Sequence, residues 1–115
     1  MAIIEVSQAQ GRVPVTVFHL QDRVNLGNAA EMEKAAREAF ENGARDMVID
    51  MTKTPSITSA GIRSLVAIYK LFSADGTNRV KLACVSPQIR EIFEVAGITQ
   101  HVEIHETVDD AVASF

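Results

Sequence analysis

Residues 47–62 read MVIDMTKTPSITSAGI, and this stretch is the part of the chain that decides the fold. Its first part, from Met47 to Met51, is a short apolar run typical of a buried strand. A loop of Thr, Pro and Ser follows, and from Ile62 onward apolar residues recur at helical spacing. The stretch therefore predicts a strand, a loop and a helix, with Thr58 and Ser59 at the point where the loop passes into the helix.

Two hydroxyl side chains at a helix start have two possible uses. The first backbone N–H groups of a helix have no partner within it, and the local potential is positive. Thr58 and Ser59 can therefore cap the helix, or the site can hold an anion such as phosphate. Position alone favours capping, which is the common use of these residue types.

Apolar spacing and turn residues predict the remaining elements in the same way. We expect strands at 3–6, 13–20, 46–51, 80–85 and 101–104, and helices that begin after Asn28, near Ile62, at Pro87 and after Thr107. An opening hairpin followed by alternating strands and helices predicts an α/β fold whose later strands are parallel. The second strand should start at a bulge or lie at an edge, because Pro14 has no N–H to donate.

The sequence also predicts individual helix caps and which side chains are buried. Asn28, with Glu31 three residues later, should cap the first helix, and Ser86 should cap the third. Thr107, with Asp110 three residues on, should open the last helix. The helix 62–74 should bury Leu65, Val66 and Tyr69 against the strand 46–51, and the third helix should bury Ile89, Ile92, Phe93 and Ala96. His19 should face solvent, and Cys84 should be a buried small hydrophobe.

The composition excludes several classes of function. We expect the 115 residues to form a single domain spanning 1–115. The net charge of −4 and the absence of a basic run argue against direct nucleic-acid binding. No apolar run approaches the roughly 20 residues of a membrane span, and no signal segment opens the chain. A single cysteine forms no internal disulfide, which fits a cytoplasmic location.

The order of elements and the strand–loop–Ser-x-Gly–helix junction resemble the STAS domain family, in particular its bacterial anti-sigma factor antagonists. Asp50 matches an aspartate at the strand end, Ser59 the serine of the family motif, Gly61 its glycine and Ile62 its apolar residue. The resemblance implies an α/β STAS-like sandwich with a mixed four- to five-stranded sheet and four helices mostly on one face.

The resemblance also implies a function. In such proteins the motif serine is phosphorylated by a partner kinase that doubles as the anti-sigma factor, and the unphosphorylated protein sequesters that partner and frees a sigma factor. Ser59 is then the phosphoacceptor, with Thr58 as the alternative, and the partners are a GHKL-type serine kinase and a PP2C-type phosphatase. The chain itself needs no cofactor or metal and performs no catalysis, since the nucleotide belongs to the kinase.

The expected partner surface combines the loop 54–60, the start of the following helix and the turn after the second strand. Its residues are Asp22, Asn25, Thr58, Ser59, Ala60, Arg63 and Ser64. Arg63 and Ser64 are included because they lie on the first helical turn, away from the apolar stripe. The chain departs from the family pattern in two places. Thr58 stands in place of an Asp, and residues 22–25 read DRVN in place of Gly-x-Leu-Asp.

Other functions compete with this interpretation. Residues 57–61 partly match the nucleophile elbow Gly-x-Ser-x-Gly, with His101 or His105 as candidate base, but Ile57 replaces the first glycine and resists the strained turn. The pair His101 and His105 also lacks the further ligands of a metal site. A third alternative is a STAS scaffold or accessory subunit of a stress-signalling or transporter complex.

Overall fold

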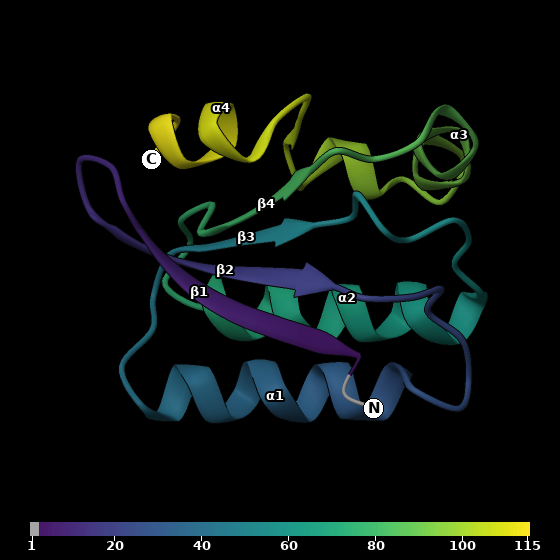
Figure 1. Ribbon diagram of the computed structural model, residues 1–115, viewed down its shortest axis with the longest axis horizontal. Coiled ribbons are helices and arrows are strands. Elements are labelled where there is room, and N and C mark those ends of the chain that lie inside the picture. The colour runs from purple at the N-terminus through teal and green to yellow at the C-terminus, as the bar shows by residue number, and fades with distance from the viewer. Residues whose placement is uncertain (1–2) are drawn as a thin grey trace.

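The computed structural model describes residues 3–115 and contains a sheet of five strands together with four α-helices and one 3₁₀ helix. Figure 1 shows their arrangement. In chain order the elements are β1 (Ile4–Gln10), β2 (Pro14–Leu20), α1 (Ala29–Glu41), β3 (Met47–Asp50), α2 (Ser59–Phe72), β4 (Val80–Ala83), α3 (Pro87–Val95), η1 (Ile98–Gln100), β5 (Ile104–His105) and α4 (Val108–Ala113).

The strands are hydrogen-bonded in chain order, β1-β2-β3-β4-β5. β1 and β2 form an antiparallel hairpin, and every later neighbour is parallel, as the alternation of strands and helices predicts. β2 is an inner strand, so the expectation that Pro14 marks an edge or bulge was wrong. Pro14 is tolerated because it is the exposed first residue of β2 and lies before the segment that pairs with β3.

The helices cover the two faces of the sheet unequally. α1 and α2 run side by side along one face, and α4 lies on the other (Figure 1). The buried side chains of α3, Ile89 and Phe93, belong to the same core as those of α1 and α2. A smaller cluster around Val15, Val17 and Val48 lies beneath α4. The mixed sheet with helices mostly on one face is therefore confirmed.

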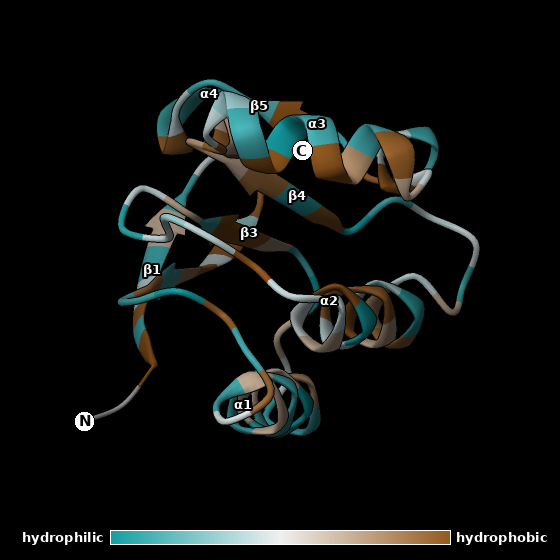
Figure 2. Ribbon diagram, turned by 90° about the vertical axis from the view of Figure 1, so that its right-hand side faces the viewer, coloured by the Kyte–Doolittle hydropathy of each residue, from teal (hydrophilic) through white to brown (hydrophobic). Residues whose placement is uncertain are grey.

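Alternation along the strands explains the two cores. Phe18, Leu20 and Ile49 face the larger core, and the alternate residues Val15, Val17 and Val48 face the α4 side. The buried residues of α1 and α2, among them Met32, Ala36, Leu65 and Ile68, recur at helical spacing, and Figure 2 shows both helices nearly end-on on the same side of the sheet. Phe40 of α1 and Phe72 of α2 pack edge-to-face with ring centroids 5.1 Å apart, which ties the two helices together.

Some predicted boundaries and burials were wrong. α2 begins at Ser59, three residues before the predicted start, since the apolar stripe does not reveal a polar first turn. Leu65 is buried as expected, but Val66 and Tyr69 are only half-buried, and Ile68 and Phe72 supply the rest of the buried face.

The C-terminal third of the chain needs similar corrections. Ile92 is 41 % exposed and Ala96 is exposed, because only one side of the short helix α3 meets the core. The last strand is Ile104–His105, and the residues before it form η1 and a turn. Cys84 is half-buried and has a φ of 60°, a left-handed conformation just after β4.

Helix capping follows the sequence at two of three predicted places. Ser86 Oγ accepts a hydrogen bond from the Ile89 N–H at 3.3 Å, and Thr107 Oγ1 accepts one from the Asp110 N–H at 3.0 Å. Asn28 occupies the N-cap position of α1, but within residues 3–115 its side chain caps no helical N–H. The predicted capping box at Asn28 and Glu31 was therefore wrong.

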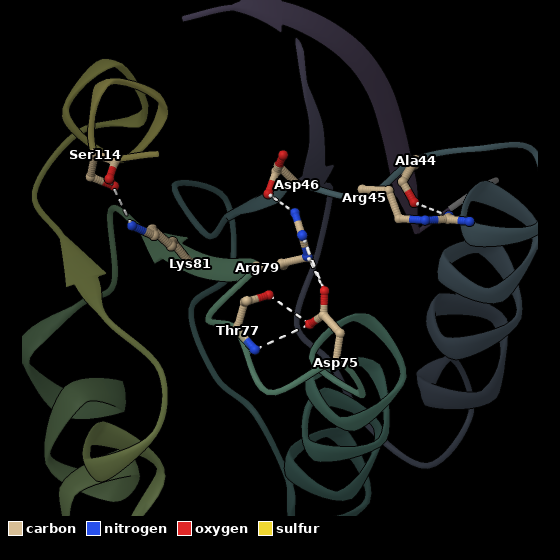
Figure 3. A network of polar contacts seen from close by, with 8 residues as sticks. All are labelled: Ala44, Arg45, Asp46, Asp75, Thr77, Arg79, Lys81 and Ser114. Carbon is tan, nitrogen blue, oxygen red and sulfur yellow. Dashed lines mark hydrogen bonds and ion pairs between the residues drawn. The ribbon is translucent and has the colours of Figure 1, made fainter. Parts of the chain in front are cut away.

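A polar network closes the end of the sheet at which β3 and β4 begin (Figure 3). The Arg79 guanidinium bridges Asp46, at 3.2 Å, and Asp75, at 3.1 Å. Hydrogen bonds from Thr77, together with Arg79, lower the pKa of Asp75 to about 2. On β4 the buried Lys81 Nζ donates to the Ser114 carbonyl at 3.1 Å. These contacts stabilise one end of the sheet and leave the opposite end, where β2 and β3 finish, for the candidate site.

Candidate functional site

Two loops meet at the ends of β2 and β3. The loop after β2 and the loop after β3 are joined by a parallel bridge between Val24 and Ile57. The Val24 N–H donates to the Ser56 carbonyl at 3.1 Å, and the Thr58 N–H donates to the Val24 carbonyl at 2.9 Å. The bridge brings residues 22–25 beside residues 56–59, although some 30 positions of sequence separate them.

Thr58 and Ser59 stand at the start of α2 with both side chains exposed. Thr58 is the N-cap residue, with φ −94° and ψ 173°, and its carbonyl accepts from the Ile62 N–H at 3.0 Å. Within residues 3–115 its hydroxyl makes no capping hydrogen bond, and the first turn of α2 contains no acidic residue. The hydroxyls therefore do not cap, and the partial positive charge of the helix end is not offset in that turn.

Gly61 is required by the packing beneath this helix start. A Cβ placed on Gly61 would lie 2.6 Å from Ile57 Cγ1 and 2.7 Å from Val24 Cγ1, which is closer than carbon atoms pack. The helix can approach the bridged pair Val24 and Ile57 only without a side chain at this position. The glycine of the motif is thus explained by close contact and not by an unusual backbone angle.

The loop after β2 is shaped by two asparagines. Asn28 Oδ1 accepts from the Asn25 N–H at 2.9 Å, and Asn28 Nδ2 donates to the Arg23 carbonyl at 2.8 Å. Asn25 Oδ1 in turn accepts from the Gly27 N–H at 2.9 Å. These contacts explain why the Asn28 side chain is not free to cap α1.

Most predicted partner-binding residues gather on this surface. Asp22 and Arg63 are exposed, Ala60 and Asn25 are half-buried, and the Val24–Ile57 bridge joins the segments that carry them. Ser64 is an exception, because it is only 6 % exposed. Its prediction as a contact residue was wrong, because Ser64, the sixth residue of α2, lies on the packed side of the helix.

A hydrogen-bond chain beside the loop was not predicted from the sequence. Asp50 Oδ1 accepts from the Thr52 N–H at 3.0 Å and from the Thr52 hydroxyl at 2.6 Å, and Asp50 Oδ2 lies 2.7 Å from His19 Nδ1. His19 Nε2 lies 2.8 Å from the Ser7 hydroxyl, which it can accept from when Nδ1 donates to Asp50. His19 is therefore engaged on both ring nitrogens, and the expectation that it simply faces solvent was wrong.

The electrostatics of Asp50 follow from these contacts. Burial by itself would raise the pKa of Asp50, but hydrogen bonds from Thr52 and His19 to the carboxylate outweigh it. The pKa of Asp50 consequently lies below its ordinary value of 3.8. The carboxylate is ionised at neutral pH and holds the first turn of the loop that leads to Ser59.

The histidines considered as a catalytic base or metal ligands lie elsewhere. The His101 ring packs 6.2 Å from the ring of Tyr69, and Tyr69 is about 15 Å along α2 from Ser59 at 1.5 Å per residue. His105 Nε2 is 3.0 Å from Glu103 Oε1. Within the described part of the chain, no three His, Cys, Asp or Glu side chains group as metal ligands would. Nor does any helix among residues 3–115 have the length and apolar character needed to cross a membrane.

The model of the STAS domain family matches residues 6–111. A protein of Bordetella bronchiseptica named putative anti-sigma factor antagonist BtrV is 30 % identical over 97 residues, which cover 84 % of this chain and 82 % of that protein.

Solved structures share the fold. The crystal structure of a putative anti-sigma factor antagonist from Thermotoga maritima has a TM-score of 0.87 at 17 % identity, covering 96 % of this chain and 92 % of that one. The structure of the Bacillus cell fate determinant SpoIIAA in its phosphorylated form has a TM-score of 0.73 at 14 % identity, covering 96 % and 97 %.

Proposed function

Because the chain belongs to the STAS domain family and is of its anti-sigma factor antagonist type, we propose that it is a phosphorylation-switched binding module. In its unphosphorylated form it sequesters a GHKL-type kinase that doubles as an anti-sigma factor, and so frees a sigma factor. The observation that carries the proposal is the pair of exposed, non-capping hydroxyls on a helix start that two bridged loops hold in place.

Ser59 is the proposed phosphoacceptor. It is the first residue of α2 and exposed, so a kinase can bring a γ-phosphate in line with its hydroxyl. Ser56 is less suitable because its carbonyl is tied to Val24, and Ser64 is buried. Thr58 is the alternative acceptor, since its hydroxyl is exposed and does not cap.

Phosphorylation would change binding and leave the fold intact. A phosphate adds about −1.5 to −2 charges at neutral pH. At the start of α2 it meets free backbone N–H groups, and Arg63 follows four residues after Ser59, the spacing at which side chains on a helix pair. A partner that packs over the neutral hydroxyl would instead have to desolvate a dianion, which is costly.

The proposed contact surface consists of Asp22, Thr58, Ser59, Ala60 and Arg63, with Asn25 as a residue that shapes the loop. The nucleotide belongs to the partner kinase, and a PP2C-type phosphatase resets the switch. The module works as a single domain in the cytoplasm, where such partners act.

The test is phosphopeptide mapping after incubation with the cognate kinase and ATP. We expect label on Ser59 that is lost in Ser59→Ala and retained in Thr58→Ala, while Ser59→Ala still binds the kinase. Label confined to Thr58 would move the acceptor by one residue. No label with a kinase shown to be active on another substrate would contradict the switch.

The alternative function is tested separately by affinity capture from native cells. Recovery of a GHKL-type kinase without a bound sigma factor supports the antagonist. Recovery of only transporter or stress-complex subunits would favour the scaffold or accessory role.

A further inference from the structure

An apolar cavity of about 440 Å³ lies between α2, the sheet and η1, at a distance from the Ser59 site along α2. Its floor is formed by Ile49 of β3 and Leu82 of β4, and its walls by Leu65 of α2 and by Ile98 and Val102 around η1. All five side chains are buried. The volume falls within the range of about 300–1,000 Å³ that is typical of small-molecule sites.

The cavity exists because the helices on this face do not meet over β4. α2 packs against α1, whereas α3 packs with η1. β4 lies between α2 and α3 in Figures 1 and 2. The sheet surface between them is apolar and lines the cavity. An apolar ligand would regain the contacts that these side chains lack.

The mouth of the cavity is polar and basic. Lys70 and His101 are exposed basic residues on its rim, and Gln100 lies beside them. No acidic side chain of residues 3–115 lines the cavity, and none of them forms an ion pair with Lys70. Because the chain as a whole carries a net charge of −4, a basic rim around an apolar cavity is a local feature that selects an anionic group.

We propose that this cavity binds a small amphipathic carboxylate, with a medium-chain fatty acid as the best match. The alkyl chain lies against Leu65, Leu82 and Val102, and the carboxylate sits at the mouth against the Lys70 ammonium and the Gln100 amide. The charge requirement distinguishes this ligand from a neutral apolar molecule of the same length.

The proposal is tested by titrating the full chain with sodium decanoate, and separately with 1-decanol, while following backbone amide NMR signals below the aggregation limit of each probe. We expect saturable shifts centred on Leu65, Leu82, Ile98 and Val102 with both probes, and tighter binding of decanoate. Shifts that fail to saturate, or that centre on the exposed apolar residues Leu26 and Val95, would show detergent-like adsorption and overturn the proposal.

Two pairs of variants test the charge at the rim and the apolar lining of the cavity separately. Lys70→Glu should weaken decanoate binding at least threefold and leave decanol binding unchanged. The matched charge reversal Lys34→Glu, at an exposed position of α1, should alter the binding of neither probe. Ala96→Trp, at the cavity lining, should weaken both probes at least tenfold, while Ala113→Trp on α4 should not. Val66→Phe replaces Ala96→Trp if the latter fails to fold. Equal effects within either pair would refute the site.

Discussion

His19 Nδ1 lies 2.7 Å from Asp50 Oδ2, so the paired residues at the ends of β2 and β3 are joined by their side chains as well as by the sheet. Thr52 donates two further hydrogen bonds to the Asp50 carboxylate. The strand-end aspartate therefore anchors the loop that delivers Ser59 to the start of α2.

The first prediction concerns Asp50→Asn. At pH 7 the variant should lower the free energy of unfolding by about 1–3 kcal/mol, because hydrogen bonds to an ionised carboxylate are lost. The pKa of Asp50 is lower in the folded chain than its ordinary value of 3.8. The ionised carboxylate therefore stabilises the fold at pH values above 3.8, and this stabilisation is lost as the pH falls through the folded pKa. Urea unfolding at pH 7 and pH 3 should show the difference from wild type shrinking at the lower pH.

Two further variants check the cause of this effect. Glu38→Gln removes a charge from an exposed position of α1 and should show little loss at either pH. His19→Ala should raise the pKa of Asp50 in a carboxyl ¹³C titration, because it removes a donor. An unchanged Asp50 titration would mean that the His19 contact is not formed in solution.

Gly61→Ala should destabilise the protein by about 1–3 kcal/mol through overpacking against Val24 and Ile57. The double variant Gly61→Ala/Val24→Ala should recover part of the loss relative to the sum of the two single variants, since the second change removes one of the opposing methyl groups. Strict additivity in thermal unfolding would rule out the clash as the cause.

Leu65→Ala should lower the free energy of unfolding by about 2–5 kcal/mol, because the side chain is only 5 % exposed and belongs to the main core. The neighbouring Val66→Ala removes a half-buried side chain and should cost less. Denaturant unfolding midpoints measure both changes. A near-neutral Leu65→Ala would contradict the packing of α2 on the sheet.

Ser59→Asp should leave the melting temperature unchanged or slightly raised, because an acidic group at a helix N-terminus is favourable by about 0.3–1 kcal/mol. Binding of the kinase partner should nevertheless weaken. Ser64→Asp, only five positions on, places a charge at a buried site and should cost roughly 3–5 kcal/mol. Calorimetric melting separates the two positions, and equal melting temperatures would contradict the assigned faces of α2.

The sequence by itself determined the order of strands and helices, the parallel character of the later strands and the location of Thr58 and Ser59 at a helix start. These features depend on local periodicity and on turn residues such as Ser86 and Thr107, whose capping hydrogen bonds form within three residues. Local patterns of this kind are visible in a single segment of chain.

Only the tertiary structure decided which polar groups meet. The Asn28 side chain was drawn away from α1 by the loop before it, and Ser64 was buried by packing that its own helix does not reveal. The contacts of His19 with Asp50 and of Gly61 with Val24 join residues more than 30 positions apart. Their physical cause is the parallel pairing of β2 with β3, which places the ends of both strands and the loops that follow them at the same edge of the sheet.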